Sequence, residues 1–213
     1  MPEETAKAIL IATRNKGKAG EFAALFGALG YEARTLLEYP ELPDIVEDQD
    51  TFLGNALKKA REIAQHLGIP VLADDSGLEA EALGGEPGVY SARYAGEPTD
   101  DAANNAKLLR ELAKRMEAAP LTEDGGPLVY GAARFISVLV LYDPQDGTWV
   151  HAEGTCPGYL LAESRGTGGF GYDPLFYLPA YGKTLAEMTM DEKNRVSHRA
   201  AALAKLAELL KRD

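Results

Sequence analysis

The sequence predicts one α/β domain with a sheet that contains antiparallel pairs. Short apolar runs at residues 8–12 and 71–74 have the composition of buried strands. Residues 129–142 and 148–156 predict two long strands, and the Pro- and Gly-containing segment between them predicts a hairpin turn. Apolar residues at helical spacing predict helices at residues 17–29, 51–67, 99–118 and 197–211.

Each expected helix has one apolar face. In the helix at 51–67 the face consists of Phe52, Ala56, Ala60, Ile63 and Leu67. Gly68 and Pro70 end this helix. In the helix at 99–118 the expected inward residues are Ala103, Ala106, Leu109, Leu112, Ala113 and Met116. In the last helix they are Ala200, Leu203, Ala207 and Leu210. Acidic residues, prolines or glycines are frequent at residues 37–50, 84–88 and 120–127, which predicts loops or turns there.

The net charge disfavours two classes of partner. Charged residues make up 26% of the chain and hydrophobic residues 46%, which is ordinary for a soluble globular protein. A formal charge of −11 disfavours binding to nucleic acid or to an anionic membrane, since both need a basic surface. The few clustered cations can still bind a phosphate locally, so they are the informative ones.

Cysteine content and the chain start bear on location. The only cysteine, Cys156, excludes an internal disulfide and fits a reducing compartment, so we expect a cytoplasmic protein. Cys156 is expected to pack in or near a strand. The start, Met1-Pro2-Glu3-Glu4, lacks the basic region of a secretory signal. Apolar runs are all shorter than the roughly 20 residues that span a bilayer.

Two adjacent acids, Asp74 and Asp75, follow the apolar run Val71-Leu72-Ala73. We expect them where a strand meets a loop, a suitable place for a divalent cation. Like charges so close repel each other, and one carboxylate would take up a proton unless positive charge lay nearby. The sequence therefore predicts that cations or a metal ion balance this pair.

A basic turn, Thr13 to Lys18, lies between the first strand and the first helix. Free N–H groups and the helix dipole make such a junction an anion site. Lys16 and Lys18 at a helix start oppose the dipole, and a bound phosphate would reverse that cost. The segment lacks the P-loop pattern, which ends in Gly-Lys-Ser/Thr. The alternative is a solvated basic turn.

A second basic segment contains Lys193, Arg195, Ser197, His198 and Arg199. Ser197 suits the N-cap of the last helix, and the cations that follow have the wrong sign for a helix start. Phosphate is their natural partner. The alternative is that some of them pair with the abundant surface acids.

Asn55 and Lys59 share one face of the helix at 51–67. Lys59 falls within the apolar stripe, where a lysine either extends to water or projects into a cleft. Glu47, in the acidic loop before this helix, is a candidate second metal carboxylate beside Asp75. The alternative for Glu47 is an ordinary loop acid.

The segment Gly168 to Pro174 is rich in glycine and aromatic residues. Glycines allow the backbone to approach a ligand closely. Phe170 and Tyr172 could stack on a base, and Asp173 could accept from a ring N–H. The alternative is a tight turn with core aromatic residues.

Together these segments resemble the inosine triphosphate pyrophosphatase family, the XTP/dITP diphosphatases. The most extensive match runs from Ala73-Asp74-Asp75-Ser76-Gly77-Leu78-Glu79 to Tyr94-Ala95-Gly96. Four further motifs match in order, and the resemblance extends from about residue 8 to residue 207. They are Thr13-x-Asn15-x-x-Lys18-x-x-Glu21, Thr51-Phe52-x-x-Asn55-Ala56-x-x-Lys59-Ala60, Gly169-Phe170-Gly171-Tyr172-Asp173-Pro174 and Lys193-Asn194-Arg195-x-Ser197-His198-Arg199.

The resemblance implies a fold and a reaction. Residues 1–213 would form a single pyrophosphatase domain, with a long mixed sheet flanked by helices and two lobes around a substrate cleft. The reaction would be hydrolysis of ITP, dITP or XTP to the nucleoside monophosphate and pyrophosphate. Mg²⁺ would be the cofactor, with Mn²⁺ as a substitute, and the protein would be a homodimer.

The resemblance also implies residue roles. Asp75 would be the proton acceptor that activates water and, with Glu47, a metal ligand. Asp74 would support the turn or the hydration of the metal. The substrate would be bound by Thr13, Arg14, Asn15, Lys16, Gly17, Lys18, Lys59, Ser76, Phe170, Gly171, Tyr172, Asp173, Lys193, His198 and Arg199.

Three positions depart from the family pattern. The family usually has Glu-Thr-Gly-x-Thr-Phe around the metal glutamate, whereas Glu47 is followed here by Asp48-Gln49-Asp50. Gly54 replaces a commonly acidic residue inside a helix, at an expected cost of about 1 kcal/mol relative to Ala. Arg14, where many relatives have a small residue, adds a charge without an evident role.

Two other functions remain open. A related Maf-like pyrophosphatase would act on modified pyrimidine or methylated nucleotides. A nucleotide sensor would use the same pocket without catalysis, although a pure binder has little reason to bring two acids near a triphosphate.

Overall fold

A computed structural model of the chain describes residues 7–123 and 125–211. They fall into two compact units whose segments interleave along the sequence. The first unit comprises the described residues of Met1–Asp75, Ser137–Gly154 and Arg199–Asp213. The second comprises those of Ser76–Ile136 and Thr155–His198. Two boundaries therefore fall inside predicted site motifs, after Asp75 and after His198.

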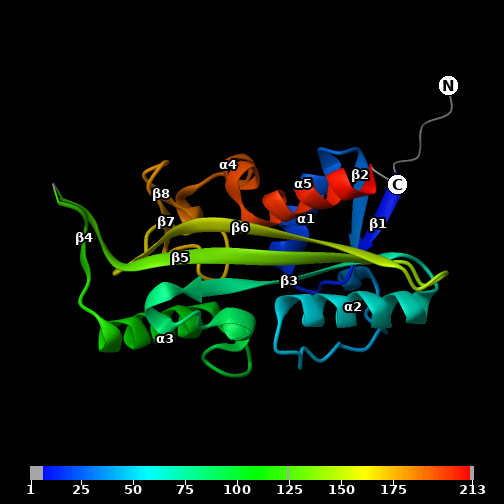
Figure 1. The fold of residues 1–213 in the computed structure, drawn as a ribbon, viewed down its shortest axis with the longest axis horizontal. Coiled ribbons are helices and arrows are strands. Elements are labelled where there is room, and N and C mark those ends of the chain that lie inside the picture. Colours follow the sequence, from blue (N-terminus) through cyan, green and yellow to red (C-terminus); the bar gives the residue numbers. More distant parts are fainter. Residues whose placement is uncertain (1–6, 124, 212–213) are drawn as a thin grey trace. The chain divides into compact units, whose positions relative to one another are not determined.

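The described strands form one eight-stranded sheet in the order β2-β1-β3-β5-β6-β7-β8, and β4 pairs with β5. Strand β1 is parallel to both β2 and β3, whereas β4 with β5, β6 with β7, and β7 with β8 are antiparallel. The predicted α/β fold with a mixed sheet flanked by helices is confirmed (Figure 1). The strands are β1 Lys7–Ile11, β2 Tyr31–Thr35, β3 Val71–Ala80, β4 Ala119–Thr122, β5 Gly125–Tyr142, β6 Trp149–Leu161, β7 Phe176–Leu178 and β8 Lys183–Thr184.

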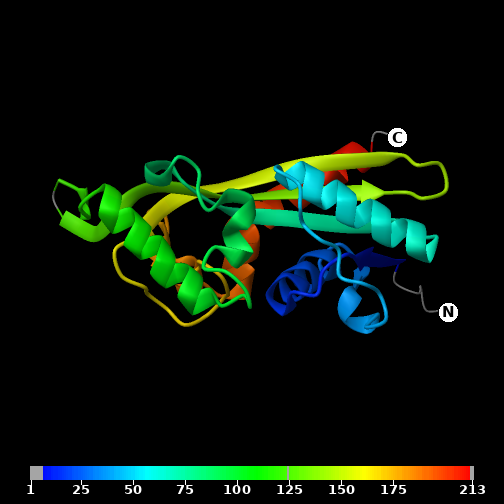
Figure 2. The same cartoon turned by 90° about the horizontal axis from the view of Figure 1, so that it is seen from below.

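In the first unit, α1 (Lys16–Gly27) and α5 (His198–Leu210) lie on one side of the strands and α2 (Phe52–Leu67) on the other (Figures 1 and 2). Thr51 caps the start of α2 and Gly68, in the left-handed conformation, ends it as predicted. Apolar side chains of α1, α5 and the strands share one buried cluster. It consists of Ile11, Phe22, Phe26, Leu72, Leu139, Ala152, Ala202, Leu203 and Leu206.

The second unit contains α3 (Asp101–Arg115) and the short α4 (Met190–Val196). Its core is built on the alternating inner residues of β3, β5 and β6, together with α3. The largest fully buried side chains there are Leu78, Leu108, Leu112, Leu160, Leu161, Leu175 and Phe176. Cys156 is buried in the same core, as predicted, and burial raises the pKa of its thiol to about 11.

Some predicted boundaries and faces are wrong. Strand β3 continues to Ala80, so Asp74 and Asp75 lie inside a buried strand and not where a strand meets a loop. The predicted turn at 120–127 is largely the β4–β5 hairpin, apart from residue 124, which lies outside the described residues. Strands β2, β7 and β8 and helix α4 were not predicted.

The inner face of α3 is rotated relative to the prediction. Leu112 is buried as predicted, but Asn104 and Leu108 are buried beside it, while Ala103, Ala106 and Ala113 are exposed. Asn104 turns inward because its amide donates to Ala92 O at 2.9 Å and accepts from Ala95 N at 2.7 Å. In α5, Leu203 is buried as predicted, but Ala202 and Leu206 are buried as well and Leu210 is exposed.

Two expectations concern the chain as a whole. In the part of the chain that the structure describes, no helix has the length and apolar character needed to cross a membrane. The expected two lobes and the single-domain organisation stay predictions, and the chain start at Met1–Glu4 lies outside the described residues.

Strands β6 and β7 lie so close together at Gly158 that a larger residue there should destabilise the fold. A Cβ at Gly158 would lie 2.6 Å from Phe176 Cε1 and 2.8 Å from the backbone oxygen of Tyr177. We expect Gly158→Ala to lower the free energy of unfolding by about 1–3 kcal/mol, because the core and the backbone must shift. Urea denaturation measures this.

Gly20→Ala is the matched control, since a Cβ there meets nothing within 4 Å and alanine favours the helix. An unfolding free energy of Gly158→Ala equal to that of the unchanged protein would contradict the described approach of the two strands.

Candidate active site

Asp74 is the centre of the first unit's polar cluster. Its Oδ2 lies 2.7 Å from Lys18 Nζ and 3.6 Å from Arg199 Nε. Ser137 donates to its Oδ1 at 2.6 Å. Burial alone would raise the pKa of Asp74, but the two cations and the hydrogen bonds outweigh it and hold the pKa well below its ordinary value. The positive charge predicted near the acids is therefore confirmed. Lys18 and Arg199 supply it, and both lie next to Asp74.

Asp75 lies in a different environment. Asn55 Nδ2 donates to its Oδ2 at 3.0 Å, and Lys59 Nζ lies 3.6 Å from its Oδ1. Burial raises the pKa of Asp75 above its ordinary value, although Lys59 and Lys18 oppose the rise. A buried carboxylate that takes up a proton more readily than usual suits a proton acceptor.

Lys59 joins Asp75 to the acidic loop. Its Nζ donates to Glu47 Oε1 at 2.7 Å and to the backbone oxygen of Asp74 at 2.7 Å. Burial alone would lower the pKa of Lys59, but the carboxylates of Asp75 and Glu47 raise it, so the ammonium stays charged. Lys59 thus projects into the cluster rather than extending to water, and Glu47 and Asp75 converge on one positive charge.

The turn before α1 has the geometry of an anion site. Thr13 Oγ1 accepts from Asn15 N at 3.2 Å, and Asn15 Oδ1 caps the helix by accepting from Lys18 N at 3.0 Å. The first-turn N–H groups, at Lys16 and Gly17, have no acceptor within the helix by its geometry. The predicted strand–turn–helix arrangement is confirmed.

Arg199 and Arg14 contact protein groups. Arg199 Nη1 donates to Glu21 Oε2 at 2.7 Å, and both side chains are buried. The alternative of pairing with acids therefore holds for Arg199, but with interior acids rather than surface ones. Arg14 donates to backbone oxygens of the loop at residues 36–42.

In the second unit, the glycine-rich loop is held by Asp173. Asp173 Oδ2 accepts from Phe170 N at 2.9 Å and from buried Lys193 Nζ. Lys193 Nζ also lies 4.8 Å from the centre of the Phe170 ring. Gly169 is required here, because it has φ +70° and a Cβ would meet Asp173 Oδ2. The loop thus groups an aromatic face, a cation and a carboxylate.

The other predicted residues of the second unit are mostly packed. His198 is buried and stacks on Phe135, with 4.9 Å between ring centres. Tyr172 is buried, and its hydroxyl donates to Ser91 O at 2.8 Å, which favours the core-aromatic alternative for this residue. Ser76 is half-buried on β3.

Gly171 is tied to α3 from both sides. Its N–H donates to Asp101 Oδ2 at 2.7 Å, and its oxygen accepts from Asn105 Nδ2 at 2.7 Å. These contacts fix the end of the loop that carries Phe170.

Three polar residues of the cluster were not among the predicted site residues. Asn55 and Glu21 occur in the motifs that carry the resemblance, and Asn55 shares a helix face with Lys59, so both had a sequence signal. Ser137 had none, because it is a small residue in the middle of a long apolar strand.

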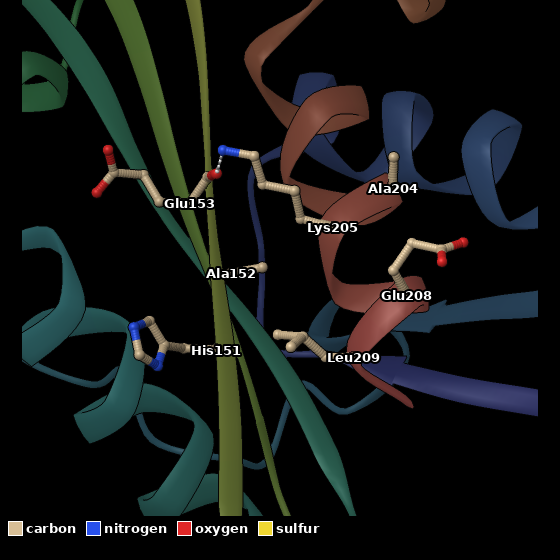
Figure 3. Close-up of a pocket in the computed structure, with 7 residues that line it drawn as sticks. All are labelled: His151, Ala152, Glu153, Ala204, Lys205, Glu208 and Leu209. Carbon is tan, nitrogen blue, oxygen red and sulfur yellow. Dashed lines mark hydrogen bonds between the residues drawn. The ribbon is translucent and has the colours of Figure 1, made fainter. Parts of the chain in front are cut away.

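A hollow between β6 and α5 of the first unit is unrelated to this cluster (Figure 3). It is lined by His151, Ala152, Glu153, Ala204, Lys205, Glu208 and Leu209. The side chains of His151 and Glu153 lie on the other side of β6 from α5, and Lys205 Nζ donates to Glu153 O at 2.7 Å (Figure 3). None of the predicted site residues lines it.

The fold and the cluster define an α/β protein that groups acids and cations at a strand–turn–helix junction. The chain belongs to the Ham1 family, whose family model matches residues 9–209. The resemblance found in the sequence is thereby confirmed.

Similar proteins cover nearly the whole chain. A dITP/XTP pyrophosphatase of Geobacillus kaustophilus is 52% identical over 202 residues, which are 95% of this chain and 93% of the relative. One of Desulforamulus reducens is 48% identical, covering 96% of each. The structure of a HAM1 protein from Coxiella burnetii matches with a TM-score of 0.81 and 36% identity, over 97% of this chain and 100% of the other.

The buried charge of Asp74 predicts a pH dependence of stability. Because its pKa lies below the ordinary 3.8, the ionised carboxylate stabilises the fold, fully above about pH 5 and progressively less as the pH falls below 3.8. We expect Asp74→Asn to lower the free energy of unfolding by about 3 kcal/mol at pH 7, since the buried guanidinium of Arg199 and the half-buried ammonium of Lys18 each lose a carboxylate. Urea denaturation from pH 7 to pH 3 measures this.

The difference between Asp74→Asn and the unchanged protein should shrink toward pH 3. Exposed Asp50 supplies the control, and Asp50→Asn should change stability little at any pH. A difference that stays constant from pH 7 to pH 3 would contradict the assigned charge of Asp74.

Proposed function

We propose that this chain is a nucleoside-triphosphate pyrophosphatase that hydrolyses ITP, dITP and XTP to the nucleoside monophosphate and pyrophosphate. The observation that carries the proposal is the convergence of Asp75 and Glu47 on Lys59, in the unit that also holds the basic turn of α1. Membership of the Ham1 family supports it, as do relatives that are dITP/XTP pyrophosphatases.

The carboxylates fit a divalent cation. Mg²⁺ is usually held by one or two carboxylates together with substrate phosphates and water. Among the described residues, no group of three or more His, Cys, Asp or Glu side chains could hold a metal ion. The two carboxylates of Glu47 and Asp75 would therefore hold Mg²⁺, or Mn²⁺ in its place, with the nucleotide phosphates and water as the other ligands. A bound ion neutralises phosphate charge and makes water a better nucleophile.

The residues of the first unit perform the proton and charge work. Asp75, oriented by Asn55, accepts the proton of the attacking water. Lys59 and Lys18 place positive charge where negative charge develops on the phosphates. The N–H groups at the start of α1 add the field of the helix dipole. A nucleotide phosphate would thus replace the solvent that otherwise faces this basic turn.

The second unit carries side chains that suit binding of the purine ring of the nucleotide. The half-buried ring of Phe170 offers a stacking face, and Lys193 and His198 are donors for the 6-keto oxygen of a deaminated purine. A 6-amino purine presents a donor at that position instead. Each buried donor left without an acceptor would cost about 1–3 kcal/mol, which selects against adenine nucleotides.

The same proposal includes the domain organisation, the oligomeric state and the location of the protein. Residues 1–213 act as one pyrophosphatase domain, since β3, β5 and β6 each contribute residues to both units. The protein works as a homodimer in the cytoplasm.

The proposed reaction predicts its products. Incubation with ITP and Mg²⁺ should yield inosine monophosphate and pyrophosphate, because attack at the α-phosphate separates the two. Ion-exchange chromatography of the products, across a panel with dITP, XTP, ATP, and modified pyrimidine and methylated nucleotides, tests this. Turnover of ITP should exceed that of ATP by at least about tenfold, the equivalent of one unsatisfied donor.

Inosine diphosphate with orthophosphate would refute the proposed reaction. Preference for modified pyrimidine or methylated nucleotides would favour a Maf-like enzyme. Binding without turnover would favour a sensor.

The role of Asp75 predicts the effect of its amide variant. We expect Asp75→Asn to lower kcat by about 10²–10⁴-fold, the usual contribution of a general base, while the fold is retained. Steady-state kinetics and circular dichroism measure the two effects. Asp50→Asn, which changes an exposed loop acid of the same unit, should leave kcat unchanged. A near-normal rate for Asp75→Asn would remove Asp75 from the mechanism.

A further inference from the structure

Arg14 lies in the basic turn, yet its guanidinium binds the acidic loop. Nη1 donates to Leu36 O at 2.8 Å, and Nη2 donates to Tyr39 O at 3.1 Å and to Leu42 O at 2.6 Å. Nε forms an ion pair with Asp44 at 2.9 Å. Four of the five N–H donors of an arginine are thus used on this loop, and a substrate could gain little from the fifth.

The loop needs such an anchor. After the 3₁₀ turn at Leu36–Glu38, the described chain has no helix or strand until α2 begins at Phe52. Glu47 lies in this irregular stretch, and its carboxylate forms an ion pair with Lys59 of α2. Holding a carboxylate at a fixed place on an irregular loop costs conformational entropy, which contacts elsewhere along the loop must offset.

The far end of the loop has its own anchor. Asn55 accepts from Gln49 N at 3.0 Å and donates to Gln49 O at 3.3 Å. Gly54 makes this approach possible, because a Cβ there would lie 2.9 Å from Gln49 Cβ. The helical cost expected at Gly54 therefore has a packing reason. Glu47 lies in sequence between this anchor and the one made by Arg14.

We propose that Arg14 is a positioning residue that holds residues 36–44 so that Glu47 is presented for the divalent cation. The proposal rests on the function proposed above and gives Arg14 a role other than binding substrate. Since Asp44 is 88% exposed, its ion pair with Arg14 contributes little, and the three bonds to backbone oxygens carry the effect.

The geometry requires an arginine. A guanidinium presents its donors in a planar fork, so one side chain reaches three oxygens in different directions. A lysine has one compact ammonium group and cannot span the same set. Arg14→Lys should therefore restore the charge of the turn without restoring the anchor.

Hydrogen–deuterium exchange of the full-length protein, without metal or nucleotide, tests the anchor directly. In Arg14→Ala, peptides covering residues 36–47 should exchange faster, while peptides over β3 should not change. Asp44→Asn, which removes only the exposed ion pair, and Arg61→Ala, which removes an exposed arginine of α2 in the same unit, should match the unchanged protein.

Steady-state kinetics test the consequence for the metal. The Mg²⁺ concentration that gives half-maximal activity should rise about tenfold in Arg14→Ala, as is usual when a group supporting a metal ligand is lost. The KM for ITP at saturating Mg²⁺ should change less than twofold. Arg14→Lys should resemble Arg14→Ala in both assays, and it serves as the milder variant if Arg14→Ala fails to fold.

Two results would overturn the proposal. One is unchanged exchange across residues 36–47 in both Arg14 variants. The other is a rise in the KM for ITP with no change in the Mg²⁺ requirement, which would make Arg14 a substrate-binding residue. If the unchanged protein turns over no nucleotide, the proposed function fails, while the exchange result still decides whether Arg14 holds the loop.

Discussion

The buried carboxylate of Asp74 is the constraint on which the first unit depends. A carboxylate in the middle of a buried strand is tolerated only if cations and hydrogen bonds meet it there. Lys18 comes from the first turn of α1, Arg199 from the first turn of α5 and Ser137 from β5. One acid therefore determines where two helices must start. It also offsets the cations at those starts, a role that the sequence had suggested for a phosphate.

The two adjacent acids, Asp74 and Asp75, have different surroundings. Successive residues of a strand point to opposite faces, so Asp74 and Asp75 meet different neighbours. The pKa of Asp74 is lowered by its cations, whereas burial raises the pKa of Asp75. Two acids whose pKa values are pushed apart by their environments can take different roles in one site. Here Asp74 is paired with the cations at two helix starts, and Asp75 is the proposed proton acceptor.

Local patterns predicted the helices at 51–67 and 197–211, the hairpin strands and the mixture of residue types at the site. They did not predict that β3 continues past Asp75, because the acids look like the end of a strand until their tertiary partners are known. They also could not show which cation meets which acid. The inward turn of Asn104 and the role of Ser137 depend on partners far away in sequence, and no periodicity encodes them.

The close approach of Gln49 to Gly54 has a consequence for exchanging parts between relatives. Relative to the family pattern that the sequence resembles, the loop has Gln49 in place of a glycine and the helix has Gly54 in place of an acid. The small residue has in effect moved from one side of the contact to the other. Substitutions at these two positions should therefore be non-additive, and a helix taken from a relative, with a side chain at position 54, would suit this loop only if position 49 changed with it.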